Sequence, residues 1–416
     1  MTKYINLTDT VYEITEKYPE VIALLAANGF EQLNNPLLRK TLGKTISLET
    51  ALRSKKINVE LFAQKLEDVI EQNRPDASTG LTAMKKDSGG EIRIEGVLPC
   101  PIRLPLLEQF DAWLAANKDG FGFDVDYDLK AASMGIDGIK ERIAANSGDE
   151  SVLSDLFMSA GFDLFFDQKL MGKFKAEGIF EDISGFERLN RDFDNDRIDL
   201  KDPLRQYAVI GVVPAIFMVN TSVLGDRPFP ESWSDLLTGE FENTISLPMR
   251  DLDLFNALLL NIYKNHGEAG IEKLGRSLLR SMHPAQMVKS HRRQADEEVP
   301  VITVMPYFFT QMIAANTPFK PVWPKDGAII SPIFLLAKAA TKAKTKPFVD
   351  FLFSKEVGEI LSGNGHFPST NPHVDNKLQP HQNFMWLGWD YINSHDIGAL
   401  LVKTENLFFA AAGKEL

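Results

Sequence analysis

The chain has 416 residues, of which 44% are hydrophobic, 10% aromatic and 25% charged. This is the composition of a globular protein with two or three domains, and it excludes disordered and fibrous classes. With 45 basic and 57 acidic residues, the net charge is −12. Such a charge argues against diffuse electrostatic binding to nucleic acid or to an anionic membrane surface.

Cysteine and histidine are scarce. Cys100 is the only cysteine, which excludes an intrachain disulfide, a CxxC redox pair and a cysteine-built zinc or iron–sulfur site. The seven histidines are scattered, so we expect neither a metal site nor a cofactor. The first twenty residues carry charges where a secretory signal needs an apolar run, and no stretch of about 18 apolar residues occurs. We therefore expect a cytoplasmic protein without membrane insertion.

Residues 1–72 are predicted to form a small helical domain. Thr10 to Glu13 fits a capping box, and Ser47 is placed to cap a later helix. Further helix boundaries are expected at Pro19, Gly29 and Asn58. Residues 73–90 are rich in Pro, Gly, Ser, Asp and Lys without apolar periodicity, which indicates a flexible linker.

From residue 91 onward, strand-like and helix-like segments alternate, which predicts a parallel α/β layer. We read residues 161–168, GFDLFFDQ, as a strand that ends in polar residues. The apolar run 207–220, broken by Pro214, suits a buried strand that crosses between two lobes. Residues 230–237 are expected to form a helix, and Pro306 is expected to begin another.

Four segments in this region resemble the extracytoplasmic solute-binding proteins of ABC importers, in the class that includes ferric-iron and polyamine binders. They are GVVPAIFMVNTSVLGDRPFPESWSDLL, VMPYFFTQMIAAN, VWPKDGAIISPIFLLAKAA and KPFVDFLFSKEVGEILSGNGHFPSTNP. The resemblance implies an α/β, two-lobed periplasmic-binding-protein-like type 2 fold with a hinge, and a monomer. The expected domain is 91–416, with lobe one at about 91–207 and 328–416, lobe two at about 208–327, and crossings near 208–216 and 318–328.

The front unit resembles a small helical domain of unknown function that is found ahead of redox and iron-repair proteins. The segments YPEVIALLAANGF and TISLETALRSKKINVELFAQKLE carry this resemblance. Members of that family often have cysteines after the Gly-Phe turn, whereas this chain has GFEQLNNPLL there, so thiol chemistry is excluded in this unit. The fusion suggests that the helical domain docks a protein partner.

Loops at the carboxyl ends of strands are the expected ligand sites in such a fold. Cys100 and Arg103 lie at the start of a helix, where a thiol has a lowered pKa. A small buried cysteine used in packing is the favoured alternative for Cys100. Asp167 faces the predicted cleft edge, although a solvated loop would also explain this residue.

Lobe two offers further candidates. Arg250 could pair with a carboxylate or oxyanion, and Asp251 could contact a cation or a helix start; a surface salt bridge is the alternative for Arg250. Tyr307 and Phe308 could stack on an organic ligand or simply pack at a helix start. The resemblance implies paired tyrosines for ferric iron, and Tyr307 is followed by Phe308, which disfavours that ion.

The leading hypothesis is a protein that binds a small-molecule or ionic solute and closes two lobes on it, as a sensor rather than a transporter component. No nucleic acid partner is expected. The alternatives are an enzyme on the same fold with Cys100 as nucleophile, and a partner-docking protein that acts through the helical domain. Sequence motifs for nucleotide hydrolysis, esterases and zinc proteases do not occur, so an enzyme is the less favoured hypothesis.

Overall fold

The chain divides into two compact units, Met1–Lys85 and Lys86–Leu416. The computed structural model describes residues 5–18, 21–22, 25, 30–34, 36–55, 59, 62–63, 66, 70, 90–98, 100–131, 137–146, 148–249, 252–281, 299–313, 317–364 and 366–413. The predicted linker, residues 73–90, lies outside this description except for Gly90. We describe each unit by itself.

The first unit is helical, as predicted. The Thr10 hydroxyl accepts from the Glu13 backbone N–H at 3.2 Å, and the Glu13 carboxylate accepts from the Thr10 N–H at 2.9 Å, which confirms the capping box. Ser47 caps the helix that begins at Leu48 through the Thr50 N–H. The helix boundaries expected at Pro19, Gly29 and Asn58 lie outside the described residues. The elements are α1 (Val11–Lys17), η1 (Glu31–Asn34), α3 (Pro36–Leu42) and α4 (Leu48–Ser54).

Apolar side chains from residues 5 to 70 form one buried cluster, which gives this small unit a hydrophobic core of its own. The cluster contains Ile5, Val11, Ile14, Tyr18, Val21, Leu25, Leu33, Leu48, Ala51, Leu52, Phe62, Leu66 and Ile70.

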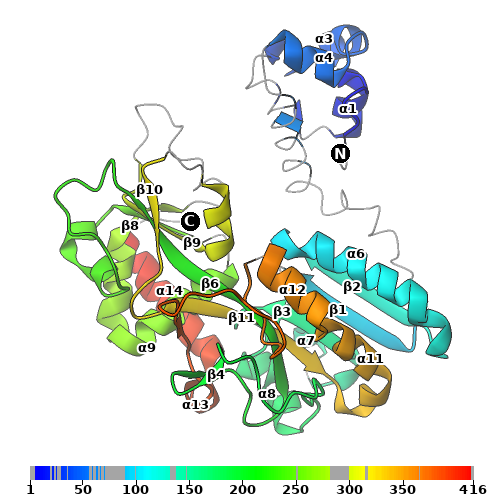
Figure 1. The fold of residues 1–416 in the computed structure, drawn as a ribbon, viewed down its shortest axis with the longest axis vertical. Coiled ribbons are helices and arrows are strands. Elements are labelled where there is room, and N and C mark those ends of the chain that lie inside the picture. Colours follow the sequence, from blue (N-terminus) through cyan, green and yellow to red (C-terminus); the bar gives the residue numbers. More distant parts are fainter. Residues whose placement is uncertain are drawn as a thin grey trace. The chain divides into compact units, whose positions relative to one another are not determined.

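The second unit contains a mixed sheet that joins two lobes (Figure 1). In lobe one, the strands pair in parallel in the order β2-β1-β3. In lobe two, the order β9-β7-β8 is also parallel. The strands of lobe one are β1 (Ile92–Leu98), β2 (Val125–Ala131) and β3 (Leu156–Ala160), and those of lobe two are β7 (Ile245–Leu247), β8 (Leu278–Ser281) and β9 (Ile302–Pro306).

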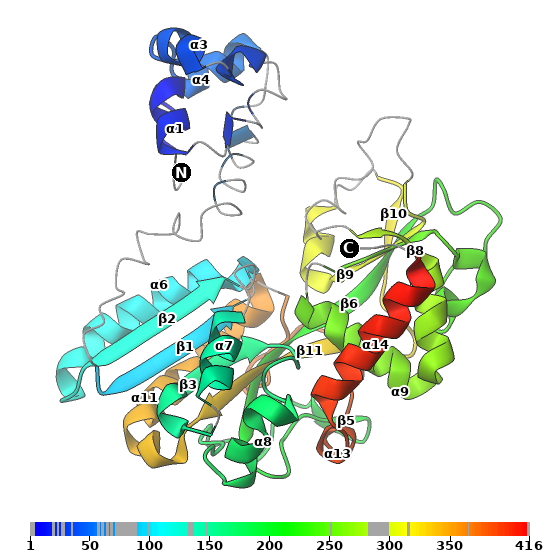
Figure 2. The same cartoon turned by 180° about the vertical axis from the view of Figure 1, so that it is seen from behind.

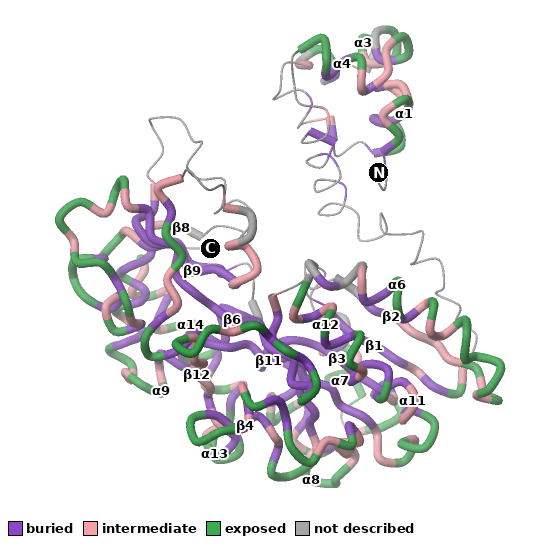
Figure 3. Tube along the Cα trace, in the orientation of Figure 1, coloured by how far each residue is buried: buried purple, intermediate pink, exposed green. Residues whose placement is uncertain are grey.

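Two long antiparallel strands, β6 (Tyr207–Asn220) and β11 (Ala328–Ala337), connect the lobes. β11 pairs with β3 on the side of lobe one, and β6 pairs with β9 on the side of lobe two. Every residue of both strands is buried (Figure 3). Burial on both faces explains why the sequence of β6 reads as an almost continuous apolar run.

Helices cover the sheet on both faces. In lobe one, α11 and α12 lie in front of the strands in the view of Figure 1, and α7 lies in front of them in the opposite view of Figure 2. The helices are α6 (Cys100–Asn117), α7 (Asp137–Ala145), α8 (Gln168–Ala176), α9 (Leu252–Ser277), α11 (Lys342–Leu352), α12 (Lys355–Glu359), α13 (Trp389–Ser394) and α14 (Ile397–Ala412). The short elements are η2 (Lys118–Gly120), η4 (Glu150–Val152), β4 (Asp194–Asn195), β5 (Ile198–Asp199), η5 (Asp235–Leu237), η6 (Gly239–Phe241), η8 (Tyr307–Met312), β10 (Phe319–Val322), η9 (Ala339–Thr341), η10 (Ile360–Asn364) and β12 (Phe384–Met385).

The crossing strand β6 has a bulge that a third segment covers. Ile333 pairs with Gly211 and Phe334 with Val209, so Ile210 is the extra residue. We call residues 366–371 the hinge strap. Its backbone bonds β6 at the bulge and just after it, because the Thr370 N–H donates to the carbonyl of the bulge residue Ile210 and the Val212 N–H donates to the Pro368 carbonyl, each at 3.0 Å.

Replacing Thr370 by valine is expected to lower the free energy of unfolding by about 1–2 kcal/mol. The buried Thr370 hydroxyl donates to the carbonyls of Val209 and Ile210 at 2.5 and 3.0 Å, and valine would leave the bulge without these bonds. Urea denaturation measures the effect. Thr238→Val is the control, since this threonine is exposed, and we expect a change below about 0.5 kcal/mol. Equal effects of the two substitutions would contradict the prediction.

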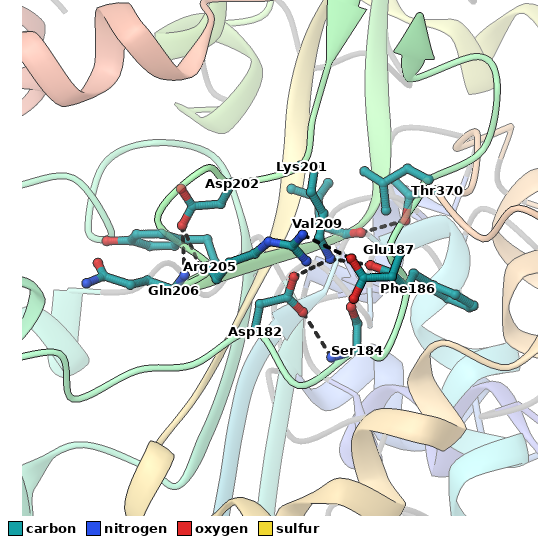
Figure 4. A network of polar contacts seen from close by, with 12 residues as sticks. Asp182, Ser184, Phe186, Glu187, Lys201, Asp202, Arg205, Gln206, Val209 and Thr370 are labelled. Carbon is teal, nitrogen blue, oxygen red and sulfur yellow. Dashed lines mark hydrogen bonds and ion pairs between the residues drawn. The ribbon is translucent and has the colours of Figure 1, made fainter.

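A buried polar network holds the chain just before β6 (Figure 4). The Lys201 ammonium lies 2.6 Å from an Asp182 carboxylate oxygen and donates to the Phe186 carbonyl at 2.6 Å. The Ser184 N–H donates to the other Asp182 oxygen at 2.9 Å. The neighbouring Asp202 carboxylate accepts the backbone N–H groups of residues 204, 206 and 207. The start of the crossing strand is thus held by charge-assisted bonds.

Two expectations about the lobes are corrected. The second crossing is β11, at 328–337, and not 318–328, because Phe319–Val322 pairs with the lobe-two end of β6 and Gly327 turns the chain with φ +102°. Lobe one does not include all of 328–416, because α14 packs against α9 of lobe two. The rings of Phe408 and Phe255 lie 5.1 Å apart, edge to face.

Three local predictions also differ from the structure. Residues 161–168 are not a strand: β3 ends at Ala160, Gly161 adopts φ +92°, and the phenylalanines that follow are buried in a loop. The helix predicted at 230–237 is only the short turn η5. Pro306 ends β9, and the element after it is the 3-10 turn η8.

Candidate ligand-binding site between the lobes

Tyr307 lies at the carboxyl end of a parallel strand, where ligand sites are expected in this type of sheet. It directly follows Pro306, the last residue of β9, and begins η8. The Thr310 hydroxyl donates to the Tyr307 carbonyl at 2.7 Å and fixes the turn. The tyrosine is half-buried, so part of its ring is accessible.

Rings from distant parts of the chain meet at Tyr307. The Trp323 ring lies 5.2 Å away, edge to face, and the His366 ring lies 5.1 Å away, tilted by 43°. Next to them, Phe308 stacks on Phe367 with 6.4 Å between ring centroids. We call these five residues the ring cluster. Tyr307, Phe308 and Trp323 are carried by lobe two, whereas His366 and Phe367 belong to the hinge strap.

Trp323 is held in place by its indole. The indole N–H donates to the Asn383 carbonyl at 2.6 Å, and the ring also packs edge to face on Phe384 at 5.6 Å. Phe384 in turn stacks on Phe193 at 4.9 Å. The indole face toward Tyr307 is therefore preorganised.

His366 combines two unfavourable features. Its backbone φ is +47°, which a residue with a Cβ adopts at a cost of about 1–2 kcal/mol. Its Nδ1 is buried and has no hydrogen-bond partner within the described part of the chain, which costs about 1–3 kcal/mol. Burial lowers the pKa of His366 below the ordinary value of 6.5, so the imidazole is neutral at pH 7.

The predicted site residues are placed as follows. Tyr307 lies in the ring cluster. Cys100 is the first residue of α6, and Arg103 is in its first turn, but their side chains are outside the description. Arg250 and Asp251 lie outside the described residues altogether. Trp323 and His366 were not predicted, although both fall inside segments that carry the family resemblance.

Asp167 has a structural contact of its own. It is the N-cap of α8, and its carboxylate accepts the N–H groups of Lys169 and Leu170 at 2.8 and 3.1 Å. Gly398, in the first turn of α14, packs closely on it: a Cβ at Gly398 would lie 3.3 Å from the Asp167 Cα. Within the described part of the chain, Asp167 shares no hydrogen bond, ion pair or ring contact with Tyr307, and the ligand role of Asp167 stays a prediction.

The described residues offer neither a metal site nor a membrane-spanning helix. Within the described ranges, His, Cys, Asp and Glu side chains form no group of three or more that could hold a metal ion. Among the helices the structure describes, none combines the length and apolar character needed to cross a bilayer.

The fold and the ring cluster define a two-lobed solute-binding protein, whose lobes are joined by crossing strands. The profile of the bacterial extracellular solute-binding proteins matches residues 151–395, more than half of the chain. The chain belongs to this family, and its ligand class is a small solute. Residues 5–62 match a domain of unknown function (DUF1858), as the sequence led us to expect.

Solved structures share the fold at low identity. The ferric binding protein from Campylobacter jejuni has a TM-score of 0.54 at 14% identity, covering 77% of this chain and 99% of that one. AfuA from Actinobacillus pleuropneumoniae, with fructose-6-phosphate bound, has 0.51 at 16%, covering 76% and 98%. The Trichodesmium protein in complex with iron and citrate has 0.51 at 14%, covering 78% and 99%. None of the curated proteins matches the chain.

Proposed function

We propose that this protein binds a small organic solute against the ring cluster and closes its lobes by movement about β6 and β11. The observation that carries the proposal is the contact between Tyr307 of lobe two and His366 of the hinge strap. A solute that replaces or extends this contact touches lobe two and the hinge strap at once, so its binding can be coupled to movement of the lobes about the hinge.

An organic solute suits this site better than a bare ferric ion. Aromatic faces offer stacking surface, whereas hard cations need several oxygen ligands. Phe308 stands beside Tyr307 where a second phenolic oxygen would serve a ferric ion, and it stacks on Phe367. Among the solved relatives, one contains iron with citrate and another a sugar phosphate, so the shared fold accommodates different ligands.

Substituting Tyr307 by alanine is expected to abolish ligand stabilisation. In a thermal-shift panel of organic solutes, a ligand at 100 times its Kd adds about 2.7 kcal/mol to the wild-type protein. Tyr391→Ala is the matched control. Tyr391, in α13, also stacks on a histidine, His395, but this pair is not part of the ring cluster. A ligand that stabilises Tyr307→Ala as strongly as wild type would refute this site. Absence of compaction in small-angle scattering with a proven ligand would refute closure.

We also propose that the protein acts in the cytoplasm as a monomeric solute sensor. The helical unit, in which residues 5–62 match a separate domain family, supports this. A second domain with its own core can dock a protein partner that responds to the ligand-bound form. Cell fractionation with an antibody against the native protein tests the location. Recovery from an extracytoplasmic fraction would favour a transport role instead.

A further inference from the structure

The contacts of His366 point to a role that packing does not explain. A phenylalanine at this position would pack on Tyr307 without burying a nitrogen that has no hydrogen-bond partner among the described residues. A glycine would adopt φ +47° without strain. Histidine has both unfavourable features: a backbone with positive φ, and a buried Nδ1 that has no hydrogen-bond partner among the described residues. Strain of this kind persists at sites where the side chain has a chemical task.

The position of His366 in the fold identifies that task. The Phe367 N–H donates to the Leu361 carbonyl at 3.0 Å, and Thr370 bonds the bulge of β6. His366 is thus tied to η10 and to the centre of the crossing strand, while Tyr307 and Trp323 follow β9 and β10 of lobe two. Among these three rings, His366 is the one that belongs to the hinge.

We propose that His366 is a ligand-binding residue, and that it hydrogen-bonds a planar, unsaturated ring solute that stacks on Tyr307 and presents an edge to Trp323, because the Trp323 ring is nearly perpendicular to that of Tyr307. This proposal rests on the proposed function and narrows its ligand class. A neutral imidazole offers one donor and one acceptor but no charge. A ring that carries N–H or O–H groups can exchange such a bond, whereas an inorganic oxyanion gains no ion pair from it.

Two substitutions separate the nitrogen from the ring. His366→Phe keeps an aromatic ring beside Tyr307 and removes both nitrogens. His366→Asn removes the ring, keeps a donor and an acceptor, and tolerates positive φ. His395→Phe is the matched control. The His395 ring stacks on Tyr391 with 4.0 Å between ring centroids, and neither residue belongs to the ring cluster. The melting temperature of each unliganded variant shows that it folds, and His366→Phe should melt at or above the wild-type temperature.

The probes are cytosine, adenine and nicotinamide as planar rings with N–H groups, and phosphate and ferric citrate as comparison solutes. We expect at least one ring solute to bind the full-length protein and to change its intrinsic tryptophan fluorescence, to which Trp323 contributes. His366→Phe should weaken that binding at least tenfold by calorimetry, while His366→Asn should stay within about threefold of wild type and His395→Phe should be unchanged.

Other outcomes overturn the inference in distinguishable ways. Equal affinity of wild type and His366→Phe for a ring solute removes His366 from the site but keeps the proposed function. Stabilisation by phosphate or ferric citrate alone, lost in Tyr307→Ala, refutes the ring-solute class and leaves a solute site at Tyr307. If no probe binds, the ligand class is wrong; if, in addition, no member of the wider organic panel binds, the proposed function fails as well.

Discussion

Replacing Trp233 by alanine is expected to lower the free energy of unfolding by about 3–5 kcal/mol. The Trp233 side chain is 1% exposed and packs edge to face on Phe217 of β6, with 4.6 Å between ring centroids. Its indole N–H donates to the Gly327 carbonyl at 2.9 Å. Alanine would leave a large cavity and an unpaired carbonyl beside the start of β11. Urea denaturation of the full-length protein measures the loss.

A conservative substitution separates the two contributions. Trp233→Phe keeps most of the buried ring and removes the hydrogen bond to Gly327, so we expect a loss of about 1–2 kcal/mol, well below that of the alanine variant. An alanine variant that loses less than about 1 kcal/mol would show that the loop around Trp233 collapses into the space.

Replacing Lys201 by alanine is expected to lower the free energy of unfolding by about 3–5 kcal/mol, because it leaves a buried carboxylate without its counter-ion. The Asp182 side chain is only 1% exposed and that of Lys201 12%. Without the ammonium, the Asp182 carboxylate keeps the Ser184 N–H but loses its counter-ion. Denaturant unfolding at pH 7 in low and high salt measures the effect, which should change little with salt because the pair is buried.

Two control variants test whether the unpaired buried charge causes the loss of stability in Lys201→Ala. Lys355→Ala removes an exposed helical pair with Glu359 and should cost less than about 0.5 kcal/mol. The double substitution Asp182→Asn with Lys201→Met removes both charges and should restore part of the stability lost in Lys201→Ala. A double variant no more stable than Lys201→Ala would show that packing of the lysine stem, rather than the stranded charge, dominates.

Local patterns in the sequence were sufficient for much of the fold. The Thr10–Glu13 capping box and the apolar run 207–220 each follow from short-range rules, and the structure confirms both. Residues 161–168 were misread because apolar periodicity does not distinguish a strand from a loop whose rings are buried. Phe165 and Phe166 pack around Tyr207 of β6, a contact that no local pattern reveals.

The candidate site was only partly predictable for a related reason. Tyr307 could be selected because it follows a predicted strand. Trp323 and His366 reach it through the pairing of β10 with β6 and through the hydrogen bonds of the hinge strap to the bulge. These contacts depend on tertiary structure. The positive φ of His366, and the lack of a hydrogen-bond partner for its Nδ1 among the described residues, are likewise visible only once the chain is folded.

The packing of α14 on α9 affects the order in which the protein can be completed on the ribosome. α9 ends at Ser277, whereas its partner begins at Ile397, and the Lys403 ammonium and Phe408 ring reach Glu268 and Phe255. Translation proceeds from the N-terminus, so the apolar surface of α9 lacks this cover until the last helix has emerged. Lobe one holds most of its strands much earlier. A nascent chain therefore exposes an unfinished second lobe for much of its synthesis, a state in which chaperone binding or aggregation is favoured.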